Sequence, residues 1–128
     1  MSWDRAIAAA AMVDLLTAAA GTAATVYDHP PATFNVPALI VAYPANLAFN
    51  TPSFCIDSAE WIVTAASGID DPSTVDQLLA IARQAIDDDP TIGGTVQICR
   101  PSGYRNWRGW TVAGAEFLLA DLALDTRM

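Results

Sequence analysis

The chain has 128 residues, of which 53% are hydrophobic and 16% charged, as expected for one folded domain around one core. This composition excludes an intrinsically disordered segment. The formal net charge is −8, and all six cations are arginines. This balance disfavours general affinity for nucleic acid or an anionic membrane, since both bind proteins through an excess of cations.

The first predicted element is a helix from Ser2, a good N-cap, to about Ala20, with Gly21 ending it. Its apolar run is far too short to span a membrane. Asp4 and Asp14 flank the run and argue against a signal peptide, so we expect no membrane partner. Alternating intervals of four, three and four residues predict one apolar helix face, made of Ala8, Met12, Leu15 and Ala19.

A short strand is predicted at Thr25–Tyr27, before a proline-rich region. Five of the eight prolines lie between Pro30 and Pro52, around a strand predicted at Ala38–Tyr43 that is apolar on both faces. The loops on either side, residues 28–37 and 44–53, carry large apolar side chains. These either fold back onto the core or contact partner subunits: Phe34, Val36, Leu47 and Phe49.

The next strand is predicted at Glu60–Ala66, with a bulge or turn around Asp57–Ala59. Its core-facing residues are Trp61, Val63 and Ala65. The second helix begins with Asp71 as N-cap and Pro72 at the first helical position. Its buried stripe is Val75, Leu78, Leu79, Ala82 and Ile86.

Asp87, Asp88 and Asp89 follow at the C-terminal end of this helix. Negative charge is unfavourable there, because the helix dipole places its negative end at the C-terminus. The three carboxylates are either a solvated helix end or a functional surface that repels anions or contacts cations.

Two further strands complete the predicted fold. Gly93 and Gly94 predict a turn before a strand at Thr95–Cys99, whose Val96 and Ile98 face inward. The last strand is predicted at Trp110–Leu124 and is apolar on both faces.

The pattern predicts an α/β (α+β) domain with one mixed or antiparallel sheet of four to five strands and two helices, in the order α-β-β-β-α-β-β. Two helices cover about one face of such a sheet. We therefore expect a neighbouring subunit to cover the second face.

No catalytic or metal-binding pattern accompanies these elements. The single histidine, His29, lies in a proline-rich segment without a nucleophile motif. Cys55 and Cys99 are expected to be reduced and buried, and two cysteines with one histidine are too few for a zinc site. We expect no enzymatic activity and no cofactor.

Between the last two predicted strands lies a segment rich in arginine and aromatic residues, expected to be a loop. Its residue types are those that dominate protein interfaces, although aromatic and arginine side chains also stack on single-stranded bases. We therefore interpret the segment as a partner or intersubunit interface, with a plain hairpin loop and a nucleic-acid contact as the alternatives. The candidate interface residues are Arg100, Tyr104, Arg105, Trp107, Arg108 and Trp110.

Two segments carry a resemblance to a known family. The sequence TIGGTVQI follows the second helix, and GWTVAGAEFLLADLAL closes the chain with Ala115, Glu116, Phe117 and Leu119 in its core. This order resembles the tail terminator (tail completion, minor tail) proteins of long-tailed bacteriophages. The resemblance covers the second helix onward, and the first half matches by element order only.

The resemblance implies a structural virion protein without chemistry or cofactor. Such subunits form a hexameric ring that caps the tail tube, ends tail assembly and joins the tail to the head connector. The implied partners are copies of itself, the tail tube protein and the head–tail connector protein, in the host cytoplasm during assembly and then in the virion tail or neck.

DNA would pass through such a ring without specific binding. Asp87, Asp88 and Asp89 would then lie on the acidic lumen or on the outer surface. The alternatives are another head–tail connector or tail-tube ring subunit and, from a different class, a small nucleic-acid- or ligand-binding accessory domain.

Overall fold

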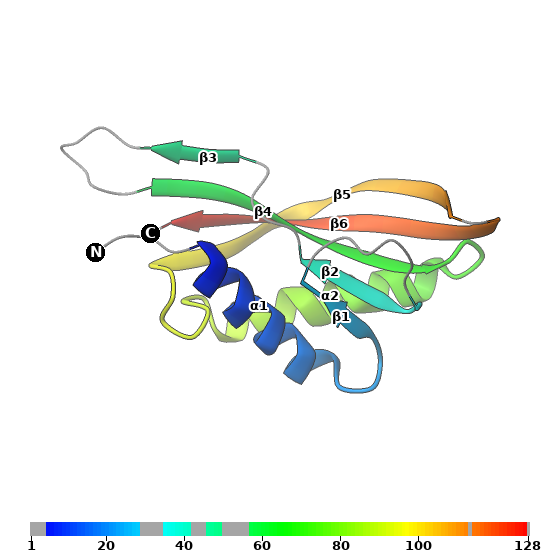
Figure 1. The fold of residues 1–128 in the computed structure, drawn as a ribbon, viewed down its shortest axis with the longest axis horizontal. Helices are drawn as coiled ribbons and strands as arrows, with labels where there is room; N and C mark the ends of the chain where they lie inside the picture. Colours follow the sequence, from blue (N-terminus) through cyan, green and yellow to red (C-terminus); the bar gives the residue numbers. More distant parts are fainter. Residues whose placement is uncertain (1–4, 29–34, 42–45, 50–56, 113, 128) are drawn as a thin grey trace.

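The structure, a computed structural model, describes residues 5–28, 35–41, 46–49, 57–112 and 114–127. His29 and Cys55 lie outside these ranges. Two helices pack on one face of a six-stranded sheet (Figure 1). The elements in chain order are α1 (Arg5–Ala20), β1 (Thr25–Tyr27), β2 (Ala38–Val41), β3 (Asn46–Phe49), β4 (Asp57–Gly68), α2 (Pro72–Asp88), β5 (Ile98–Val112) and β6 (Ala115–Arg127).

The sheet has the strand order β1-β2-β4-β6-β5, and β3 also pairs with β4. Only β1 and β2 are parallel, and the other pairs are antiparallel. The predicted α/β fold with two helices and one mixed sheet is confirmed. The structure adds β3 within the segment 44–53 expected to be a loop, because its backbone pairs with the first four residues of β4.

Helix α1 ends at Gly21 as predicted, with a positive φ of 57° at that glycine. The predicted buried face is wrong in its second half. Leu16 and Ala20 are buried, whereas Leu15 is half-buried and Ala19 exposed. Helix α1 carries apolar residues on nearly every side, so the spacing of these residues does not define one buried face. Packing against α2 and the sheet selects that face.

Helix α2 forms as its sequence predicts. The carboxylate of Asp71 accepts hydrogen bonds from the Thr74 hydroxyl (2.6 Å) and the Thr74 backbone N–H (3.3 Å). These bonds, chiefly that of the Thr74 side chain, lower the pKa of Asp71. All five residues of the predicted stripe are buried against the sheet.

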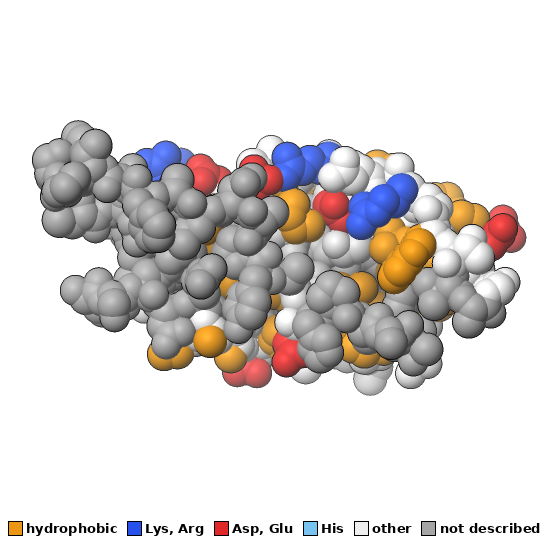
Figure 2. All heavy atoms as spheres, turned by 45° about the horizontal axis from the view of Figure 1, so that its top comes forward, with side chains coloured by type: hydrophobic (Ala, Val, Ile, Leu, Met, Phe, Trp, Pro, Cys, Tyr) orange, Lys and Arg blue, Asp and Glu red, His pale blue; other side chains and the backbone are white. Residues whose placement is uncertain are grey.

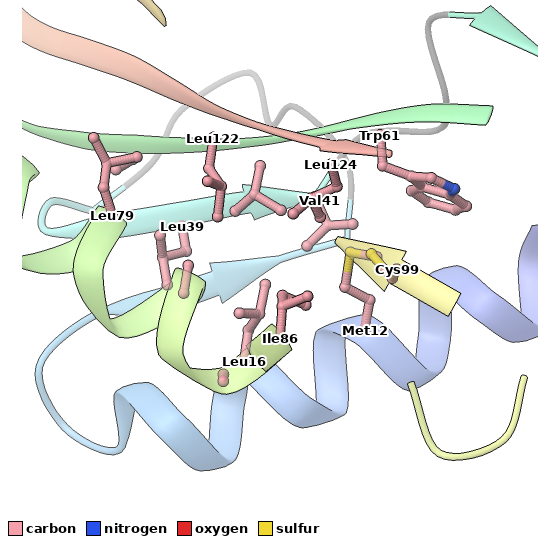
Figure 3. Close-up of a cluster of buried hydrophobic side chains, with 14 of the residues drawn as sticks. Met12, Leu16, Leu39, Val41, Trp61, Leu79, Ile86, Cys99, Leu122 and Leu124 are labelled. Carbon is pink, nitrogen blue, oxygen red and sulfur yellow. The ribbon is translucent and has the colours of Figure 1, made fainter. Parts of the chain in front are cut away.

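The core lies between the helices and the sheet, and Figure 3 shows side chains from both layers meeting there. Trp61, Val63 and Ala65 of β4 are fully buried in it, as predicted. The predicted bulge at Asp57–Ala59 is wrong, since β4 pairs with β6 in unbroken register from Ser58.

The opposite face of the sheet is partly buried without a second chain. Ala38, Ala66 and Leu119 form a small cluster there, with Tyr27 and Phe117 packed against it. A neighbouring subunit is therefore not needed to explain the apolar character of β2 or of the middle of β6.

The two predicted C-terminal strands have different boundaries in the structure. The Gly93–Gly94 turn is confirmed, but β5 begins only at Ile98, and Cys99 rather than Ile98 is buried in the core. The predicted strand Trp110–Leu124 is wrong at its start, because a turn with Gly114 at φ 82° separates Trp110 on β5 from β6. Glycine at this position allows the chain to reverse.

Burial makes Cys99 a poor nucleophile. Burial raises the pKa of its thiol to about 11 from an ordinary value of 9.0, although the Thr126 hydroxyl donates a hydrogen bond to its sulfur at 3.4 Å. In a Cys55→Ser background, we expect thiol reagents at pH 8 to modify Cys99 about a hundredfold more slowly in the folded than in the unfolded chain. Equal rates in the two states would contradict this burial.

The same pKa shift predicts a loss of stability at high pH. The folded pKa exceeds the unfolded one, so the contribution of Cys99 is complete below pH 9 and is lost as the pH rises towards 11. The loss is about 2–3 kcal/mol for a shift of this size. Urea denaturation between pH 8 and 11 should show it in the parent chain and not in Cys99→Ala.

Candidate protein interface on strand β5

The arginine- and tryptophan-rich segment is a strand and not a loop. Residues 98–112 form β5, which pairs along one side with β6. Its other side has no partner strand among the described residues, because β5 is the last strand of the sheet. The segment was expected to be a loop because it lies between two predicted strands. Pairing with the apolar β6 overrides its weak local preferences.

The register of β5 against β6 assigns the candidate residues to different faces. Arg100, Arg105, Arg108 and Trp110 lie opposite Asp125, Asp121, Leu119 and Phe117, on the sheet face away from the helices. Tyr104 lies opposite the core residue Leu122 and lines a hollow with Arg83 on the helix side. Trp107 falls in a register shift between Arg105 and Arg108. The structure thus brings four of the six candidates onto one face.

A buried carboxylate lies beneath this register shift. Asp121 is only 5% exposed and accepts three side-chain hydrogen bonds. The donors are the Thr64 hydroxyl at 2.8 Å, the Asn106 amide at 3.2 Å and the Arg108 guanidinium at 3.2 Å. Arg108 also donates to the Asn106 carbonyl oxygen at 2.8 Å. A buried charge needs such partners.

Sequence reasoning missed this network. The signal was the single aspartate in the apolar run LLADLAL, since an acidic residue inside a buried strand requires donors from neighbouring strands. The sequence does not identify the donors, because Thr64 and Asn106 reach Asp121 only through strand pairing.

The arginines on this face have acidic partners within the chain. Arg105 forms an ion pair with Glu60 of β4, across the intervening strand β6, and Arg108 pairs with Asp121. Figure 2 shows arginine and acidic side chains interspersed over this face, with an apolar patch beside one arginine. Such pairing reduces the attraction of these arginines for phosphate.

The acidic excess of the described side chains lies mainly in the helix layer. Among the described side chains, the two helices and their adjoining turns carry seven acidic residues and one arginine, Arg83, a formal excess of six negative charges. Those of β4, β5 and β6 carry four acidic residues and four arginines, so they balance. The seven acidic residues are Asp14, Asp70, Asp71, Asp76, Asp87, Asp88 and Asp89.

The three aspartates at the end of α2 have local partners. Arg83 lies 3.8 Å from Asp87, and Gln84 donates to Asp88 at 2.9 Å. Asp89 caps the helix and accepts a hydrogen bond from the Gly93 N–H at 2.9 Å, which holds the following turn. Asp87 and Asp88 are exposed, and Asp89 is half-buried.

The edge strand β5 is irregular. Its pairing with β6 shifts between Pro101 and Gly103 and again between Arg105 and Arg108, and Asn106 has a positive φ of 59°. Bulges and proline on an edge strand hinder the addition of another strand. The exposed aromatic side chains are therefore a better contact than the edge backbone: Tyr104 is 39%, Trp107 47% and Trp110 43% exposed.

Two hollows adjoin β5 within the described residues. One of about 110 Å³ lies beside Tyr104, and the other, of about 250 Å³, lies between Arg100 and Arg127. Ligand pockets usually measure about 300–1,000 Å³, so both are small for an organic ligand.

The described part of the chain contains no group of three metal-ligating side chains and no helix long and apolar enough to cross a membrane.

Comparisons with known proteins find a similar fold among solved structures. The chain matches no protein family and no curated protein. Among solved structures, it is similar to a chain from the virion of a native gene transfer agent (GTA) particle, with a TM-score of 0.55 and 15% sequence identity. The match covers 98% of both chains, so the two chains share this fold from end to end.

Proposed function

We propose that this chain is a structural subunit of a phage-like particle. In our proposal its copies form a ring that caps the tail tube, ends tail growth and joins the tail to the head connector. The observation that carries the proposal is the whole-chain fold likeness to a chain of a gene transfer agent virion. The sequence resemblance to tail terminators supports the finer role.

The surface of β5 supports contact with protein rather than with DNA. Trp107 and Trp110 are large, exposed aromatic side chains of the kind that dominate protein interfaces. Their neighbours Arg105 and Arg108 already have carboxylate partners. We therefore assign this surface to contacts between subunits or with the tail tube.

The charge distribution also supports a ring through which DNA passes without binding. The helix layer, with its excess of negative charge, would repel phosphate wherever it faces the channel. No catalytic chemistry and no cofactor enter this proposal.

The test is assembly with purified tail tubes of the particle, followed by electron microscopy. We expect rings of this chain at one end of each tube and no further tube growth after addition. Rings that bind only the isolated head connector would instead assign the chain to the connector. A chain that stays monomeric and binds neither structure would contradict the proposal.

The same preparation tests the nucleic-acid alternative. We expect no binding of single-stranded DNA at micromolar protein, because the net charge of −8 opposes phosphate contact. Micromolar binding that weakens steeply as salt rises would favour an accessory nucleic-acid-binding domain.

A further inference from the structure

The register shift between Arg105 and Arg108 places Trp107 outside the regular alternation of β5. Asn106 adopts a left-handed backbone conformation within it, which asparagine tolerates better than most residues but which remains unfavourable. Something must hold the chain in this conformation on an exposed edge.

Asp121 supplies the holding contacts from the neighbouring strand. Its two carboxylate oxygens bind two residues of the shifted segment: Oδ2 accepts from the Asn106 amide, and Oδ1 accepts from Arg108. Thr64 of β4 donates to Oδ1 at 2.8 Å and fixes the carboxylate from the other side. Three strands therefore meet at one buried charge.

We infer that Asp121 is the positioning residue of the β5 interface. Through Asn106 and Arg108 it fixes the segment 105–108, so that Trp107 is presented to the protein partner in one ordered arrangement. Trp110 lies in the regular part of β5 that follows. A preorganised surface loses less conformational entropy on binding than a mobile one. The inference rests on the proposed function, and the partner that it commits to is the tail tube.

The test compares Asp121→Asn with Asp125→Asn. Asp125 lies four residues further along β6, on the same face and opposite Arg100, but it is exposed. Each variant removes one negative charge from the same face. Amide hydrogen exchange of residues 105–108 reports the order of the segment, and sedimentation with tail tubes reports attachment.

In Asp121→Asn we expect exchange at residues 105–108 to be roughly tenfold to a hundredfold faster, as for the loss of charge-assisted hydrogen bonds. Attachment should weaken at least about tenfold, while exchange in α1 and α2 stays unchanged. Asp125→Asn should behave as the parent chain in both measurements. If Asp121→Asn does not fold, Asn106→Gly has the same expected effects, because glycine keeps the positive φ but lacks the amide donor.

Unchanged exchange at residues 105–108 would overturn the positioning role, and faster exchange with full attachment would overturn its link to the interface. A parent chain that never assembles or attaches would contradict the proposed function, and with it the interface. The exchange comparison would then still decide whether Asp121 holds the segment.

Discussion

Replacing Trp61 with alanine is expected to lower the free energy of unfolding by about 3–5 kcal/mol. Trp61 is fully buried among the side chains between the sheet and the helices (Figure 3). Its removal leaves a cavity that the closely packed core around it cannot fill without moving. Urea denaturation followed by circular dichroism measures the change.

Trp107→Ala is the matched control, because it makes the same chemical change at a site that is 47% exposed. We expect its free energy of unfolding to stay within about 0.5 kcal/mol of the parent chain. Equal destabilisation by the two substitutions would show that Trp107 is part of the folded core and would remove it from the proposed interface.

The double substitution Trp107→Ala/Trp110→Ala is expected to abolish attachment to tail tubes at concentrations where the parent chain attaches. A single hot-spot residue contributes about 2 kcal/mol or more to binding. Removing one such residue already lowers the affinity roughly thirtyfold, so the double variant should lose at least that much. The measurement is co-sedimentation with tubes over a range of protein concentration.

The control for this prediction is Ile7→Ala, which removes an exposed apolar side chain from α1 in the helix layer, 58% exposed. It should leave attachment unchanged. If Ile7→Ala weakens attachment and the double tryptophan variant does not, the contact surface lies on the helices and not on β5.

The tryptophans test the interface better than the arginines do. A double substitution of Arg105 and Arg108 by alanine follows directly from the sequence, where both are expected on a loop. In the structure, however, Arg108 donates to the buried carboxylate of Asp121. Its removal would leave that charge with fewer partners and disturb the strand itself, so a loss of assembly would have two explanations.

The sequence by itself determined the elements whose signals are local. Helix α2 formed as predicted, because its N-cap, its proline and its apolar stripe all specify the same helix. The end of α1 at Gly21 and the Gly93–Gly94 turn were likewise predicted, since glycine takes up the positive φ angles found there. The two-helix α/β class followed from these elements.

The tertiary structure alone decided the buried face of α1 and the course of β5. Helix α1 is apolar on almost every side, so Leu16 rather than Leu15 became buried through packing. Strand β5 has little local preference for extended structure, and its conformation comes from pairing with β6. The run of apolar residues after Trp110 gave no indication that the chain reverses direction at Gly114.

The candidate interface shows the same division. Its enrichment in arginine and aromatic residues could be read from the sequence alone, because the composition of a segment does not depend on how the chain folds. Their distribution between the two faces, and the network that joins Asp121 to Thr64, Asn106 and Arg108, depend on the register of three strands. Register is set by contacts between residues distant in the chain, and a shift of one residue would reverse every face.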